Sequence, residues 1–387
     1  MCNFTTHRTV PCVAMIYLDN AATTKPCKAC VEAMTEALTS QWGNPSAQYH
    51  FGVEAARLLR KCRTDVAQAL GAETDRVFFT AGGTEADNWA ISAAAERLGK
   101  RGRHIVTTAI EHSAVGKPMH KLEEQGFEVT YLQPDAQGRI TVEALQQALR
   151  KDTILVSIMM VNNESGAVMP IERMAKLTHR LCPHALFHTD AVQGFFKVPF
   201  RAATLGADMI SVSGHKIHGP KGVGALYLRP GLKLPPMILG GGQEGGLRSG
   251  TEGVPQIVGF AAACAENLPH RMEHIAHQNR LKTMLQEGLR QIEGVHLIGA
   301  QEAPHIVNMA VPGLRSQGLL NKLQDHGICV SAGSACSKGH RSHVLEAMGV
   351  DPELIDGSIR ISMCHTTTQE EIHTLINLLP SVIRELR

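Results

Sequence analysis

The sequence has few aromatic residues and almost no net charge. Only 4% of its 387 residues are Phe, Trp or Tyr, and 38 Lys and Arg against 36 Asp and Glu leave a net charge of +2. A surface that binds nucleic acid usually needs a basic field and aromatic rings on which bases stack. The composition therefore argues against direct binding of nucleic acid or of an anionic membrane.

The chain also lacks an apolar run of membrane-spanning length, and its opening segment has no apolar core ending in a small-residue cleavage site. Its ten cysteines are scattered over the whole length instead of being clustered as in a disulfide scaffold. We therefore expect a soluble, unexported, cytoplasmic protein with reduced thiols.

Short apolar runs rich in Val, Ile and Thr alternate with polar or amphipathic stretches from Arg103 to Tyr227. The runs HIVTTAI, FEVTYL, TILVSIMMV, ALFHTD, ADMISVS and GALYLR predict buried strands, and segments such as Ile171 to Leu181 predict helices. This alternation is typical of an α/β domain with a mostly parallel sheet.

A second domain is expected because the chain is too long for one core of usual size. Gly and Pro interrupt the alternation between Pro230 and Gly253, and a long helical stretch from Val254 through Ile292 follows. We place a large domain at residues 16–259. A smaller α+β domain takes residues 260–387, together with residues 1–15.

One lysine lies where a cofactor aldehyde could reach it. In SVSGHKIHGPKGVGALYL, Lys216 follows a predicted strand, and Ser213, His215 and Gly219 flank it. A desolvated lysine at such a position can form a Schiff base. The plainer alternative is a solvated loop lysine, and the small polar neighbours weigh against it.

Polar residues end two other predicted strands. In LFHTDAVQG, Asp190 could pair with a protonated pyridine nitrogen and Gln193 could reach a ring oxygen, although Asp190 could instead cap the next helix. In VFFTAGGTEADN, a strand, a glycine pair and a helix follow one another, so the N–H groups of Gly83 and Thr84 would face a phosphate.

Two further polar residues also follow strand-like runs. His112 in IEHSAV could stack on a bound pyridine ring, or it could be an ordinary surface histidine. Asn163 in VNNESG could bind a ring oxygen or the substrate.

The C-terminal part contains a candidate nucleophile and a candidate carboxylate-binding residue. Cys336 lies in SAGSACSKGH, a run of small residues with Lys338, His340 and Arg341 close behind, and nearby cations favour the reactive thiolate. The alternative is an inert buried thiol. Arg360 in GSIRIS is a strand-borne guanidinium suited to bidentate binding of a carboxylate.

Together these residues resemble the cysteine desulfurases of the NifS/IscS type, in the class V aminotransferase group of fold-type I pyridoxal 5'-phosphate (PLP) enzymes. The likeness runs from about Tyr17 to the C-terminus. It rests on YLDNAATT, WGNPS, GGTEADN, EHSAV, VNNESG, HTDAVQ, SGHKIHGPKGVGALY, GGGQEGGLRSGTE, SAGSAC and SIRIS. The resemblance implies a large PLP-binding domain with a mainly parallel seven-stranded sheet, and a small domain that carries the cysteine loop.

The resemblance also assigns roles. Lys216 would hold PLP as a Schiff base, and Asp190, Gln193 and His112 would contact the ring. The phosphate would be bound by Gly83, Thr84, Ser213, His215 and, from the second subunit of a homodimer, Thr251. Asn163 and Arg360 would hold the substrate carboxylate, with Asn44 in a nearby loop.

The reaction implied is removal of sulfur from L-cysteine, which leaves L-alanine and a persulfide on Cys336. An acceptor protein, such as an iron–sulfur scaffold or a tRNA thiolation factor, would take the sulfur.

Two departures from the family pattern stand out. Only seven residues separate Cys336 from Val344, about two fewer than is usual for the long-loop group. Cys364 and His365 stand where relatives commonly have Gly-Arg.

Other interpretations remain open. A selenocysteine lyase would use the same lysine and scaffold. A sulfur-trafficking or scaffold protein would not need the full set of Lys216, Asp190, His112 and Cys336. A zinc site at Cys27 and Cys30 lacks a second Cys or His pair at suitable spacing, so we expect no metal.

Overall fold

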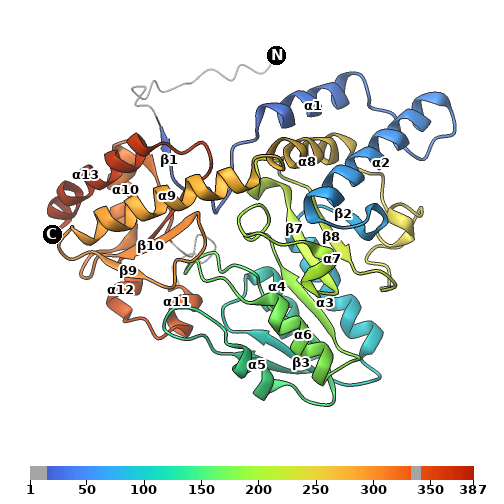
Figure 1. Ribbon diagram of the computed structural model, residues 1–387, viewed down its shortest axis with the longest axis horizontal. Coiled ribbons are helices and arrows are strands. Elements are labelled where there is room, and N and C mark those ends of the chain that lie inside the picture. The colour runs from blue at the N-terminus through green and yellow to red at the C-terminus, as the bar shows by residue number, and fades with distance from the viewer. Residues whose placement is uncertain (1–14, 333–340) are drawn as a thin grey trace.

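A seven-stranded sheet lies at the centre of the larger unit in the computed structural model, which describes residues 15–332 and 341–387 (Figure 1). In spatial order its strands are β2 (Val77–Thr80), β8 (Gly224–Leu228), β7 (Met209–Ser213), β6 (Leu186–Asp190), β5 (Thr153–Ser157), β3 (His104–Thr108) and β4 (Glu128–Leu132). Strands β7, β6, β5, β3 and β4 run parallel, whereas β8 is antiparallel to both of its neighbours. The predicted mostly parallel sheet is confirmed.

Helices cover both faces of this sheet. One face carries α3 (Gly83–Leu98) and α4 (Ser113–Glu124), and the alanine-rich side of α3 allows a close approach to the strands. The other face packs against α1 (Lys28–Thr39), α2 (His50–Leu70), α5 (Val142–Ala148), α6 (Ile171–Leu181), α7 (Ala202–Leu205) and α8 (Val254–Asn267). Strands buried on both faces read as continuous apolar runs, which is why the sequence indicated them clearly.

A smaller α+β unit follows (Figure 1). Its antiparallel sheet has the order β12 (Ser358–Ser362), β10 (Ile306–Ala310) and β9 (His296–Ile298). Its helices are α9 (Arg271–Arg290), α10 (Ser316–Asp325), α11 (His343–Ala347), α12 (Pro352–Asp356) and α13 (Gln369–Leu386). Near the start of the described chain, β1 (Ile16–Tyr17) pairs in parallel with β11 (Ile328–Cys329) of this unit.

The predicted single helix from Val254 to Ile292 is wrong. Helix α8 ends at Asn267 and α9 begins at Arg271. Pro269 lies in the break, where its ring and missing N–H disfavour a continuous helix. Helix α8 packs in the core beside the large sheet, whereas α9 crosses to the smaller unit (Figure 1). The division of the chain after residue 259 stays a prediction.

The described residues show two further features. None of their helices is long and apolar enough to cross a membrane. Their seven cysteines are all free thiols.

Candidate active site

Four of the five predicted phosphate-binding residues line one cavity at the carboxyl ends of the strands. The cavity has a volume of about 760 Å³ and lies at the N-terminus of α3. Gly83 and Thr84 contribute from that helix, and Ser213 and His215 contribute from the end of β7 and the turn after it. Parallel sheets bind ligands at this edge because the strand ends and helix N-termini meet there.

The glycine pair is required by local geometry. A Cβ atom at position 83 would lie 2.6 Å from Cγ2 of Val192, and Gly82 has a φ of 155° that favours glycine. The helix therefore begins with its backbone N–H groups close to the cavity, where the first turn has no intrahelical acceptor for them. Lys221 adds a positive charge to the lining. The cavity suits an anion such as a phosphate.

Lys216 lies beside the segment that follows β1. Its Nζ donates hydrogen bonds to the carbonyl oxygens of Ala21 and Ala22, both at 2.7 Å. The side-chain amide of Gln193 donates to the same Ala21 oxygen at 2.8 Å. Lys216 and Gln193 follow two different strands in the sequence. In the structure both side chains donate to the carbonyl oxygen of Ala21.

Asp190 is a buried carboxyl at the end of β6. One of its oxygens accepts a hydrogen bond from the backbone N–H of Val192 at 2.8 Å. Burial raises the pKa of Asp190 to about 7, and the nearby carboxyl of Asp87 adds to that shift. A bound cation would oppose the shift by stabilising the ionised form. The site thus suits a protonated ring nitrogen.

His112 is the N-cap residue of α4, and its Nδ1 accepts a hydrogen bond from the N–H of Ala114 at 3.1 Å. Burial lowers the pKa of His112, while the charges of Asp190 and Lys216 act on it in opposite directions. A neutral imidazole in electrostatic contact with both residues suits a stacking role.

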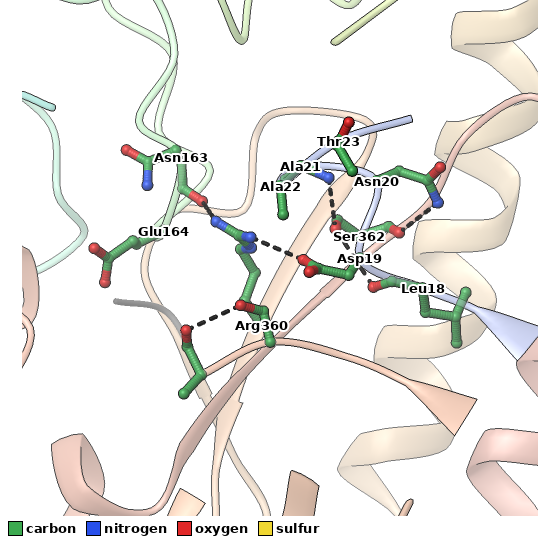
Figure 2. Close-up of polar contacts among 12 residues, drawn as sticks. Leu18, Asp19, Asn20, Ala21, Ala22, Thr23, Asn163, Glu164, Arg360 and Ser362 are labelled. Atoms are coloured by element: carbon green, nitrogen blue, oxygen red, sulfur yellow. Dashed lines mark hydrogen bonds and ion pairs between the residues drawn. The ribbon is translucent and has the colours of Figure 1, made fainter. Parts of the chain in front are cut away.

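Arg360 reaches the same region from β12 of the smaller unit (Figure 2). Its Nη1 donates to the backbone carbonyl oxygen of Asn163 at 2.9 Å, and its Nη2 donates to Oδ1 of Asp19 at 2.9 Å. The side chain of Asn163 turns away from the guanidinium (Figure 2). The contact with Asp19 was missed from the sequence because the two residues are 341 positions apart.

Two predicted residues are not brought into this cluster, and a third cannot be placed in it. Asn44 and Thr251 are exposed and do not line the cavity, and Oδ1 of Asn44 accepts a hydrogen bond from the N–H of Ser46. Cys336 lies outside the described residues. The roles assigned to all three stay predictions.

A group of histidines lies close to the unusual Cys364–His365 pair. The ring centroids of His365 and His274 are 4.1 Å apart and stacked, and those of His365 and His218 are 4.4 Å apart. Buried Lys197 is close enough to affect the pKa of all three rings. Within residues 15–332 and 341–387, no group of three or more His, Cys, Asp or Glu side chains could hold a metal ion.

These histidines are expected to make the fold sensitive to acid. Burial lowers the pKa of His365 to about 3, whereas an unfolded histidine titrates at about 6.5. Between pH about 6.5 and pH about 3 the unfolded chain therefore binds more protons than the folded chain. The stability contributed by neutral His365 is complete above this pH range and is lost as the pH falls through it. In urea unfolding, His365→Gln should lose less stability than the wild type between pH 7 and pH 5.

His296→Gln is the matched control, because His296 is an exposed histidine on β9. It should keep the pH dependence of the wild type. Equal pH dependence in His365→Gln and the wild type would contradict the prediction.

The comparisons of this chain with known families, relatives and solved structures agree with one another. Residues 16–375 match the family described as Aminotransferase class-V. A cysteine desulfurase from Nostoc sp. is 42% identical over 380 residues, which cover 97% of this chain and 94% of the relative. A solved structure named NIFS-like protein superposes with a TM-score of 0.91 at 39% identity, covering 96% of this chain and 100% of the other. The structure named SspA in complex with cysteine has a TM-score of 0.80 at 34% identity, covering 91% and 99%.

Proposed function

This chain belongs to the class V aminotransferase family, and on that basis we propose that it is a PLP-dependent cysteine desulfurase. It removes sulfur from L-cysteine, releases L-alanine and holds the sulfur as a persulfide on Cys336. The observation that carries the proposal is that Lys216, Asp190 and the glycine turn lie at one edge of the sheet, where the glycine turn lines a cavity suited to a phosphate.

The residues present fit the cofactor. Lys216 would hold it covalently, Asp190 and Gln193 would contact the ring, and His112 would stack on it. Its phosphate would be bound by Gly83, Thr84, Ser213 and His215, all of which line the cavity. When bound, PLP supplies an electron sink for the negative charge left on the substrate carbon.

The chain's own residues supply the remaining chemistry. Arg360 would bind the substrate carboxylate, with Asn163 and Asn44 beside it. The buried Asp190 would hold a positive charge on the ring nitrogen. The thiolate of Cys336 would attack the substrate sulfur, so that an S–S bond forms as the C–S bond breaks.

Exposed apolar side chains support the proposal that the protein is a homodimer. The stretch from α1 to α2 exposes large apolar side chains, among them Leu38 at 61%, Trp42 at 69% and Tyr49 at 63%. Leu239 is 83% exposed and lies in the same connecting segment as Thr251. Contiguous exposed apolar surface usually marks an interface, and we propose that these side chains belong to one. A second copy of the chain would cover them and bring its Thr251 to the phosphate.

The described free thiols fit a reducing compartment such as the cytoplasm. There a protein acceptor, such as an iron–sulfur scaffold or a tRNA thiolation factor, would take the persulfide sulfur.

The direct test supplies the PLP-loaded protein with L-cysteine and a thiol reductant, and measures alanine and sulfide. The two products should appear in equal amounts, since each turnover releases one of each. L-Selenocysteine is tested in parallel. Alanine from selenocysteine with none from cysteine would identify a selenocysteine lyase, and alanine from neither would favour a trafficking or scaffold protein.

A further inference from the structure

The guanidinium of Arg360 is almost fully buried, yet only part of it has hydrogen-bond partners. Its side chain is 4% exposed. Nη1 and Nη2 bind the Asn163 carbonyl oxygen and Asp19 Oδ1, whereas the buried Nε has no hydrogen-bond partner among the described residues (Figure 2). A free carboxylate can accept from two nitrogens of a guanidinium at once, and the contact with Asp19 uses one oxygen. A bidentate carboxylate would therefore satisfy this cation better than Asp19 does.

The backbone around Asp19 is fixed. The N–H of Leu18 donates to the carbonyl oxygen of Cys329, and the N–H of Asn20 donates to the carbonyl oxygen of Ser362. The N–H of Ala21 donates to the Ser362 hydroxyl at 2.8 Å. The Asp19 side chain itself is 20% exposed. Rotation of this one side chain toward solvent would break its pair with Arg360 and leave every one of these backbone bonds in place.

We propose that Asp19 competes with the substrate for Arg360. In the substrate-free protein its carboxylate neutralises the buried guanidinium, and the α-carboxylate of the incoming amino acid displaces it and also pairs with Nε. The inference rests on the proposed function, because it assigns Arg360 to the substrate carboxylate. It makes Asp19 a specificity-determining residue, since an amine without a carboxylate cannot take its place on Arg360.

The segment that carries Asp19 stays at the site when the substrate displaces the Asp19 side chain from Arg360. Two and three residues after Asp19, the carbonyl oxygens of Ala21 and Ala22 accept hydrogen bonds from Lys216. One fixed segment therefore holds the lysine through its backbone and the arginine through a single side chain.

The test is Asp19→Asn, which keeps the shape of the side chain and removes its charge. Calorimetry on the PLP-loaded protein measures binding of L-alanine and of ethylamine, which lacks the carboxylate. The Kd for L-alanine should fall about ten-fold, because a charge-assisted hydrogen bond no longer has to be displaced, and the Kd for ethylamine should not change. The KM for cysteine should fall with little change in kcat.

Asp19→Glu keeps the negative charge and should bind L-alanine no more tightly than the wild type. Weaker binding of L-alanine by Asp19→Asn would show that Asp19 orients Arg360, and unchanged binding would show that the two carboxylates do not compete. Either result overturns the proposal. If Asp19→Asn does not fold, Asp19→Ser is measured instead. The proposed function fails separately, if the wild type makes no alanine from cysteine.

Discussion

Replacing Lys216 with alanine should remove the visible absorbance of the PLP-loaded protein and lower cysteine turnover by at least about 1,000-fold. An imine between a lysine amine and the cofactor aldehyde is the chromophore, and alanine has no amine with which to form it. Absorbance spectra after addition of PLP and removal of the excess measure the first effect. Alanine release measures the second.

Two variants separate loss of this bond from a general disturbance of the site. Lys216→Arg keeps a cation and donors for the carbonyl oxygens of Ala21 and Ala22 but cannot form the bond, so it should also lack the absorbance. Lys221→Ala removes a lysine that lines the cavity at the glycine turn. It should keep the absorbance at saturating PLP. A Lys216→Ala protein as yellow as the wild type would contradict the assignment of this lysine.

Much of the fold and several site residues could be predicted because their signals are local. Asp190 and Ser213 each end an apolar run that is buried on both faces, and such a run reads as a strand in any context. The glycine pair before α3 predicts a turn that leads into a helix. Since parallel strands end at one edge of a sheet, residues that follow different strands could be placed together without knowing any contact between them.

The features that could not be predicted depend on contacts between distant parts of the chain. No local pattern shows that Asp19 pairs with Arg360, or that His218 and His274 both contact His365. The prediction of one long helix was wrong for a different reason. Apolar residues continue past Pro269, so the apolar pattern does not show the break between α8 and α9. Periodicity shows which side of a helix is buried, but tertiary packing decides which residues meet across the core.

Replacing Cys336 with serine should separate cofactor binding from sulfur removal. The roles proposed for the cavity, Lys216 and Asp190 in binding PLP do not involve this thiol, so the absorbance of the PLP-loaded protein should remain. Alanine release from cysteine should fall by at least about 100-fold, because a serine hydroxyl stays protonated at neutral pH and attacks sulfur poorly, whereas a thiolate attacks it well. Mass spectrometry after incubation with cysteine should find no added sulfur on the variant.

Cys329→Ser is the matched control, since Cys329 is a free, partly exposed thiol seven residues earlier in the chain. It should keep alanine release and the persulfide on Cys336. Selenocysteine distinguishes the remaining outcomes, because a lyase that expels selenium without a protein nucleophile would keep its activity in Cys336→Ser. Turnover of cysteine by Cys336→Ser at the wild-type rate would show that the sulfur leaves by a route that does not pass through this thiol.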